Sequence, residues 1–181
     1  MQPDISALLQ CVTDVLLESQ IKIGYSENPV GLYFPLDSLC RTLGMQTDEA
    51  GMDAFLQSLP DTELGHITVS RKGTRYCLTV PVEGVRYVHE HVHDSGFLTD
   101  LIALLAAHPH GLTIEAIRDV FERYSSCVVC REVQDEEFDY LLYFADGKPD
   151  QYRYLISMEM GHASYHRFSP ADFEAFGFQI S

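Results

Sequence analysis

The sequence is poor in positive charge. Only 12 Lys and Arg residues stand against 27 Asp and Glu residues, so the formal net charge at pH 7 is −15. Residues 1–94 hold 13 acids and six bases and residues 95–181 hold 14 acids and six bases, so the excess is spread evenly. A chain this acidic repels phosphate backbones and anionic membrane surfaces at long range. Nucleic acid is therefore an unlikely partner.

Long hydrophobic runs are also missing. The longest, LIALLAA at residues 101–107, has seven residues, whereas a membrane-spanning helix needs about 20. The opening MQPDISALLQCVTDVLLESQ has no basic start and carries Asp4 and Asp14, which is not the pattern of a secretory signal. We expect no membrane partner.

The chain has no tryptophan, and its five cysteines are an odd number at irregular spacing. We interpret them as reduced thiols and predict a cytoplasmic protein. An apolar fraction of 46% rules against disorder. A chain of this length can bury roughly 70% of its unfolded surface, so no disulfide or metal is needed to hold the fold. We also expect no cofactor.

The order of elements in the first half predicts a winged helix-turn-helix domain over residues 1–81. Apolar spacing and turn residues indicate a helix, a short strand, two helices and a β-hairpin. These segments are residues 3–20, 32–34, 35–43, 47–59 and 66–80, with Thr47 as the expected cap of the third helix.

A second, winged-helix-like unit is predicted over residues 96–181, after a helical linker at 82–95. Helical spacing recurs in this unit, and three strand-like runs predict a three-stranded antiparallel sheet before a short last helix. Residues 125–136 show no clear pattern. The predicted fold class is α+β.

Two stretches resemble a known family. QIKIGYSENPVGLYFPLDSL and FDYLLYFADGKPDQYRYLISMEMGHASYHRF are similar to an uncharacterised bacterial domain-of-unknown-function family. The resemblance covers most of the chain. It implies no activity, and no site residue can be transferred from it.

A basic hairpin tip is the first candidate site. Arg71, Lys72 and Arg75 lie in HITVSRKGTRYCLTV, as in a DNA-binding wing. The helix that would enter the major groove, TDEAGMDAFLQSL, has three acids, no Lys or Arg, and only Gln57 for base readout. We therefore favour a solvated tip or a protein contact over DNA.

Metal and redox chemistry are weaker candidates. Cys127 and Cys130 form a CxxC, and His108 and His110 lie upstream. A structural zinc site needs four such ligands in a tetrahedron. The spacing of these cysteines and histidines matches no paired-knuckle pattern, so we predict no metal site.

The terminal sheet is the third candidate. If its strands pair in sequence, Asp139, Arg153 and Arg167 could share a face, near Tyr165 and His166. Such groups suit acid–base work on an anionic substrate and equally suit the solvated face of a sheet. We favour the solvated face, and the tyrosines of this region favour a surface for partner contact or self-association.

Together these observations predict a non-enzymatic interaction or regulatory module that uses a winged-helix scaffold for protein contact. One alternative is a DNA-binding transcriptional regulator. The other is an enzyme or metal-binding protein centred on the terminal sheet or on the CxxC. Fold analogy alone does not decide among them.

Overall fold

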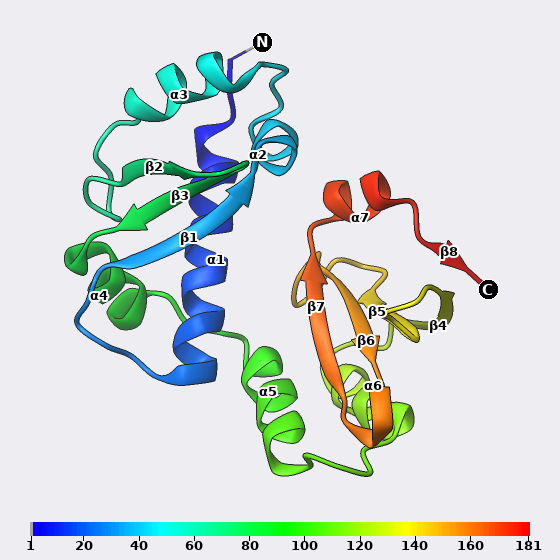
Figure 1. The fold of residues 1–181 in the computed structure, drawn as a ribbon. Helices are drawn as coiled ribbons and strands as arrows, with labels where there is room; N and C mark the ends of the chain where they lie inside the picture. The colour runs from blue at the N-terminus through cyan, green and yellow to red at the C-terminus, as the bar shows by residue number, and fades with distance from the viewer. Residues whose placement is uncertain (1) are drawn as a thin grey trace. The chain divides into compact units, whose positions relative to one another are not determined.

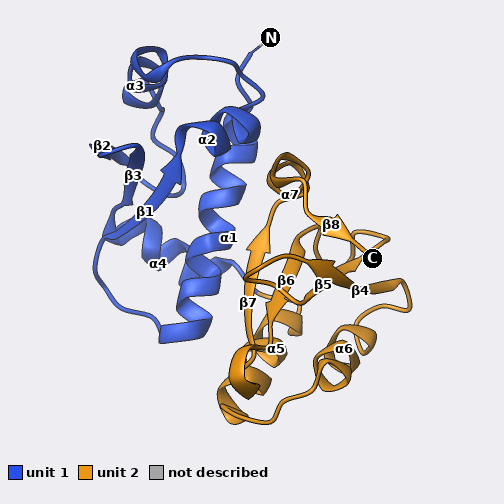
Figure 2. Ribbon diagram, turned by 45° about the vertical axis from the view of Figure 1, so that its right-hand side comes forward, with its two compact units in different colours: residues 1–93 blue, residues 94–181 orange. Residues whose placement is uncertain are grey.

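The structure, a computed structural model, describes residues 2–181 and divides the chain into two compact units, residues 1–93 and 94–181 (Figures 1 and 2). Seven α-helices and two antiparallel sheets form from the described residues. The predicted α+β class is thereby confirmed. Among residues 2–181, no helix combines the length and apolar character needed to cross a membrane.

The first unit has four helices and a three-stranded sheet in which β3 is the central strand, in the order β1-β3-β2. In chain order its elements are α1 (Ile5–Ile23), β1 (Val30–Pro35), α2 (Leu36–Leu43), α3 (Glu49–Gln57), β2 (Thr68–Lys72), β3 (Arg75–Val80) and α4 (Val82–His91). The predicted order of elements up to the hairpin is confirmed.

Local sequence explains where these helices begin and end. The carboxylate of Asp4 accepts a hydrogen bond from the backbone N–H of Ala7 and so caps α1. Gly44 ends α2 with a φ of +64°, a conformation that a side chain disfavours. The cap of α3 is Asp48, whose side chain accepts from the N–H of Gly51. The prediction of Thr47 was wrong by one residue, since both side-chain types can cap.

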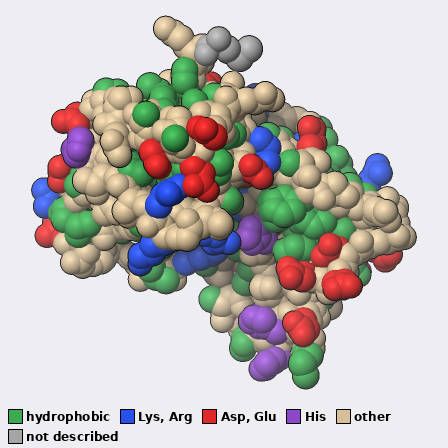
Figure 3. Space-filling view, turned by 45° about the horizontal axis from the view of Figure 1, so that its top comes forward, with side chains coloured by type: hydrophobic (Ala, Val, Ile, Leu, Met, Phe, Trp, Pro, Cys, Tyr) green, Lys and Arg blue, Asp and Glu red, His purple; other side chains and the backbone are tan. Residues whose placement is uncertain are grey.

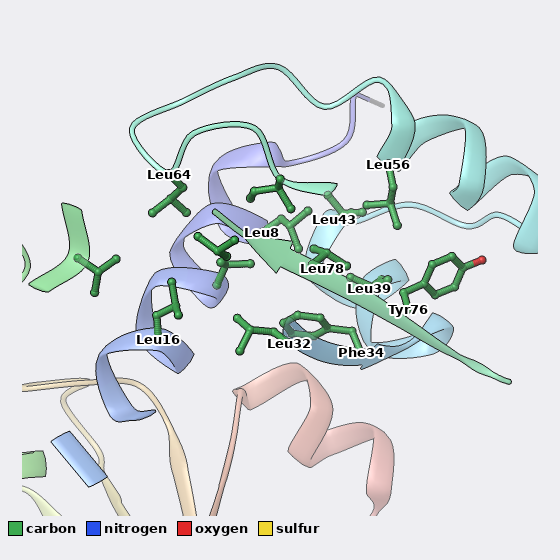
Figure 4. Close-up of a cluster of buried hydrophobic side chains, with 14 of the residues drawn as sticks. Leu8, Leu16, Leu32, Phe34, Leu39, Leu43, Leu56, Leu64, Tyr76 and Leu78 are labelled. Carbon is green, nitrogen blue, oxygen red and sulfur yellow. The ribbon is translucent and has the colours of Figure 1, made fainter. Parts of the chain in front are cut away.

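The core of the first unit draws on every one of its helices (Figure 4). Helix α1 supplies buried leucines and valine, and Leu78 of the central strand is fully buried. Helix α4 occupies the region predicted as a linker. Its Val85 and Val88 are buried in this same core, so α4 packs as part of the first unit.

The second unit begins with α5 (Phe97–Ala107) and α6 (Ile114–Glu122). Its sheet has five strands in the order β7-β6-β5-β4-β8, where three were predicted. The remaining elements are β4 (Val128–Gln134), β5 (Tyr140–Phe144), β6 (Arg153–Ser157), the short 3-10 helix η1 (Glu159–Gly161), β7 (Ser164–Phe168), α7 (Pro170–Phe176) and β8 (Gln179–Ile180).

This unit differs from the predicted winged-helix-like one. Within residues 94–181, all of which are described, two helices and no strand precede β4. The unclassified segment 125–136 contains β4, which joins β8 to the meander. Its sequence VVCREVQ lacks strict alternation of apolar and polar residues, which is why the sequence pattern did not identify it.

Aromatic side chains hold the second unit together. The ring of Phe97 contacts those of Phe121, Phe144 and Tyr154 in edge-to-face geometry, with centroids 4.7, 4.9 and 5.5 Å away. The other face of the sheet carries a smaller cluster around buried Leu141 and Leu155. Both faces of this sheet are therefore packed.

Candidate functional site

The β2–β3 hairpin presents the three predicted wing cations at one end of the first unit's sheet. Lys72 and Arg75 are directly opposite each other across the turn. Gly73, in the turn, has a φ of +62°, which a glycine at the first central position of a type II′ hairpin turn adopts readily. The hairpin shape predicted from the sequence is confirmed.

Arg71 is bound to α3. Its guanidinium donates a hydrogen bond to the carboxylate of Glu49, and this bond raises the pKa of Arg71. The hydroxyl of Tyr76, in the strand beside it, donates to the backbone carbonyl of Glu49 at 3.2 Å. Tyr76 is 1% exposed, and its hydroxyl points away from the core cluster (Figure 4). Two contacts thus join the hairpin to the start of α3.

The charged residues of helix α3 are all acidic. Asp48 caps it, Glu49 and Asp53 follow, and the helix contains no Lys or Arg. One of the three wing cations is therefore already paired with a carboxylate of the helix that would have to approach phosphates. Asp and Glu side chains are spread over much of the visible molecular face, whereas many of the Lys and Arg side chains gather in one region (Figure 3).

One face of the first unit's sheet points away from the core. Three rows cross it from β2 through β3 to β1, and we call these nine residues the open sheet face. They are Lys72, Arg75 and Pro35; Ser70, Cys77 and Tyr33; and Thr68, Thr79 and Gly31.

Seven of the nine residues are exposed, and none is acidic. The Lys72 ammonium lies 5.8 Å from the centroid of the Tyr33 ring, within the range of a cation–π contact. Sequence reasoning missed Tyr33. It lies between Leu32 and Phe34, which are buried, so the period of two along a strand places it on the outward face.

The predicted polar face of the terminal sheet is split in two. The strands pair in sequence, and β6 and β7 place Arg153 opposite Phe168, Tyr154 opposite Arg167 and Leu155 opposite His166. Because neighbouring residues of a strand point to opposite faces, Arg153 and Arg167 lie on different faces. The expectation that they share a face with Asp139 does not hold.

On the face covered by α5 and α6, Arg167 and Tyr165 each contact a tyrosine ring. The Arg167 guanidinium carbon is 4.2 Å from the centroid of Tyr152, and the rings of Tyr165 and Tyr154 are 5.7 Å apart. The hydroxyl of Tyr154 donates to the Asp150 carboxylate at 2.6 Å. Burial first, and then the Asp150 charge, raise the pKa of Tyr154 well above its ordinary value.

On the opposite face, Arg153 and His166 also pack on rings. Arg153 lies 4.2 Å from the centroid of Tyr143, and the His166 ring lies 4.4 Å from that of Phe168. Asp139 accepts a hydrogen bond from the backbone N–H of Met158 at 2.7 Å. These contacts account structurally for three of the five predicted polar residues.

A pocket of about 670 Å³ opens beside this face. It contains Asp139, Tyr165 and His166, while neither Arg153 nor Arg167 lines it. The remaining lining comes from Glu136, Glu137, Phe138, Ser157, Met158, Glu159 and Ser164. A carboxylate and an imidazole thus share one pocket, but its other charges are carboxylates and its character is not that of an anion site.

The structure separates the two cysteines proposed for metal or redox chemistry. Cys130 pairs with Leu142 in the ladder, and Cys127 lies three residues earlier, opposite Ala145. An odd spacing along extended backbone puts their side chains on opposite faces. Burial raises the pKa of the Cys130 thiol, which disfavours the reactive thiolate.

The histidines of this candidate site are also placed elsewhere. His108 uses Nδ1 in a contact with the Leu104 carbonyl oxygen at 3.1 Å, and His110 is exposed in the turn between α5 and α6. Across residues 2–181, no three His, Cys, Asp or Glu side chains are arranged to hold a metal ion.

Comparison with known protein families matches residues 5–177 to DUF3877, a domain of unknown function described from an E. rectale gene. The match covers nearly the whole chain, so the chain belongs to this family. The resemblance to a bacterial domain-of-unknown-function family is confirmed. No curated protein and no solved structure matches the chain.

Proposed function

We propose that this member of the DUF3877 family is a non-enzymatic interaction or regulatory module, and that its first unit is a winged-helix scaffold used for protein contact. The order helix, strand, helix, helix, strand, strand and the sheet order β1-β3-β2 support the scaffold assignment. The five cysteines of the chain, an odd number at irregular spacing, support a reducing, cytoplasmic location.

The contact between Arg71 and Glu49 is the observation that carries the proposal. A helix that reads DNA needs Arg, Lys, Asn or Gln directed at base edges, with cations beside the phosphates. Here α3 offers carboxylates, and one of them binds a wing cation. A duplex placed against α3 would face the carboxylates of Asp48, Glu49 and Asp53 and no Lys or Arg of that helix.

The net charge of the whole first unit also disfavours DNA binding. Residues 1–93 contain 12 acids and six bases, a net charge of −6. Non-specific DNA affinity comes from neutralising several phosphates and releasing their counterions. Two unpaired wing cations on an acidic unit supply little of this free energy, whereas a protein partner requires no such series of positive charges.

Fluorescence anisotropy with a labelled random duplex tests the proposal. We expect no retention of duplex at about 150 mM salt and protein concentrations up to about 10 µM, a concentration inside the range of ordinary non-specific dissociation constants, about 1 to 100 µM. A matched experiment uses Arg71→Glu. Binding by the wild-type chain at low micromolar concentration, lost in Arg71→Glu, would establish the DNA-binding alternative and overturn the proposal.

A second candidate function has one observation in its favour. Asp139 and His166 line the same pocket, and a carboxylate with an imidazole can perform acid–base chemistry. Ligand-observed NMR with a small-molecule panel, repeated with His166→Ala, tests it. Saturable binding that requires His166 would support an enzyme, and binding independent of His166 would speak against one.

A further inference from the structure

We infer that the open sheet face and the outer edge of β2 bind an extended acidic segment of a partner protein. This inference rests on the proposed function, because it names the chemistry of the partner. Three features of the first unit carry it: charge segregation across the sheet, a pair of opposed cations, and an edge strand beside them.

Charge segregation is the first feature. The chain has 27 acids, yet none of the nine residues of the open sheet face is acidic, and two are cations. The opposite side of β2 differs, because Arg71 there is bound by Glu49. Exposed charges farther away than about 8 Å are largely screened at physiological salt. A short ligand on this face therefore experiences local positive charge despite the acidity of the whole chain.

The opposed cations are the second feature. Lys72 and Arg75 face each other across the antiparallel pair, an arrangement that destabilises a hairpin. Among the described residues, no salt bridge joins either side chain to a carboxylate, and Lys72 lies over Tyr33 instead. A carboxylate placed between the two cations would remove their repulsion. Binding of an acidic side chain thus corrects an unfavourable contact that the hairpin alone retains.

The edge strand is the third feature. Because β2 is the last strand of the sheet β1-β3-β2, half of its backbone N–H and C=O groups point away from β3. Four of its five residues are exposed. An extended peptide can add to such an edge, and its backbone supplies affinity while its side chains supply selectivity. Figure 1 shows β2 at the margin of the sheet, with α1 on the side opposite the open face.

The same cations discriminate among possible occupants. Pairing β2 with β2 of a second copy would bring two Arg71 and two Lys72 side chains together, and basic edge strands resist such pairing. A nucleic acid strand has a negative charge at every residue and draws its affinity from several neutralised phosphates. Two free cations match a segment with two or three carboxylates far better.

Fluorescence anisotropy with a synthetic peptide provides the test. The probe is a fluorescein-labelled peptide of about eight residues in which Glu alternates with Val, a strand-forming pattern. We expect saturable binding, no binding of the matching Lys–Val peptide, and binding at least tenfold weaker for the Lys72→Glu/Arg75→Glu variant. N-methylation of alternate peptide residues removes donors needed for strand addition, and we expect it to weaken binding at least tenfold.

The control variant is Arg131→Glu/Lys148→Glu, which makes the same change in net charge at exposed positions of the second unit. It should bind like wild type, and circular dichroism should show both variants folded.

Absence of binding up to about 1 mM protein, equal loss in the control variant, or equal binding of the N-methylated peptide would overturn the inference. Capture of labelled oligothymidylate, lost in Lys72→Glu/Arg75→Glu, would assign the face to single-stranded nucleic acid instead. If duplex DNA and acidic peptide both fail to bind, only this inference fails and the proposed function stands.

Discussion

The two units use their sheets in opposite ways. In the first unit, apolar residues of the sheet face its helices and the other face is open, with Lys72, Arg75 and Tyr33 exposed. In the second, apolar clusters lie on both faces, around Phe97 on one and Leu155 on the other. A sheet whose two faces are both covered by its own apolar clusters has little surface left for a partner. The first unit is therefore the one whose sheet keeps a face for binding.

The units also differ in how their strands are connected. Strand β1 pairs with β3, the last of the unit's three strands along the sequence. In the second unit, β4 to β7 pair with their sequence neighbours. Similar runs of helices followed by strands along the sequence thus fold into different topologies, because one unit has a strand before its second helix and the other has none.

Removal of the central ring of the second unit should have the largest effect. Phe97→Ala deletes a ring that contacts four other aromatic rings, so we expect a loss of about 3–5 kcal/mol in the free energy of unfolding. Hydrogen exchange measured by mass spectrometry should show faster exchange in residues 94–181 and unchanged exchange in 2–93. Equal loss in both ranges would contradict the description of two separate cores.

A tight helix contact in the first unit comes next. A Cβ on Gly84 of α4 would lie 2.2 Å from the backbone carbonyl oxygen of Leu64, and backbone cannot easily move away. We expect Gly84→Ala to lower the free energy of unfolding by about 2–3 kcal/mol, measured by urea denaturation. Glu90→Ala, at an exposed position of the same helix, should change it by less than about 0.5 kcal/mol. A neutral Gly84→Ala would show that α4 is not held against the 62–65 turn.

Alkaline pH should lower the free energy of unfolding of the second unit through the ionisation of Tyr154. An unfolded tyrosine ionises near pH 10, while burial keeps the folded Tyr154 protonated to higher pH. The stabilisation is therefore fully present below pH 10 and is lost as pH rises further, with a slope of up to about 1.4 kcal/mol per pH unit. Urea denaturation of wild type and Tyr154→Phe between about pH 8 and pH 11 tests this.

The Tyr154→Phe variant lacks this titration. At pH 8 it should be less stable by about 1 kcal/mol, because it loses the hydrogen bond to Asp150. The difference should shrink as pH rises above 10. Parallel curves for the two proteins would mean that Tyr154 ionises equally in the folded and unfolded states.

The hairpin turn should give the smallest effect. Gly73 has a φ of +62°, and no atom lies within 4 Å of an added Cβ, so Gly73→Ala costs only the strained backbone conformation. We expect a loss of about 1 kcal/mol, measured by urea denaturation and confined to residues 2–93. Gly111→Ala, which also combines a positive φ with open space, is the matched control in the second unit. If Gly73→Ala left the free energy of unfolding unchanged, the turn would not require a glycine at this positive φ.

Much of the local structure could be predicted from the sequence. Thr113 and Ser169 cap α6 and α7, and Gly44 ends α2. The sequence itself marks such helix ends, because capping depends on residues within one turn. The segment containing β4 was not recognised, since pairing with β5 and β8 stabilises it from outside its own sequence. The pocket likewise joins residues from three separate stretches, 136–139, 157–159 and 164–166.

The predicted sites show the same limit. The three wing cations were identified, but the attachment of Arg71 to Glu49 across 22 positions was not. Arg153 and Arg167 were assigned to one face although strand register separates them. A shift of one residue in pairing turns every side chain to the other face, and no local pattern fixes that shift between two strands with several polar residues.

The sequence by itself determined the acidity of the chain, the α+β class and most helix ends, because these depend on composition and on neighbours within a few residues. Tertiary structure alone decided which cations stay unpaired, which sheet face remains open and which candidate residues meet. Those outcomes depend on strand register and on packing between distant segments, where burial of apolar area selects one arrangement among many that the local sequence permits.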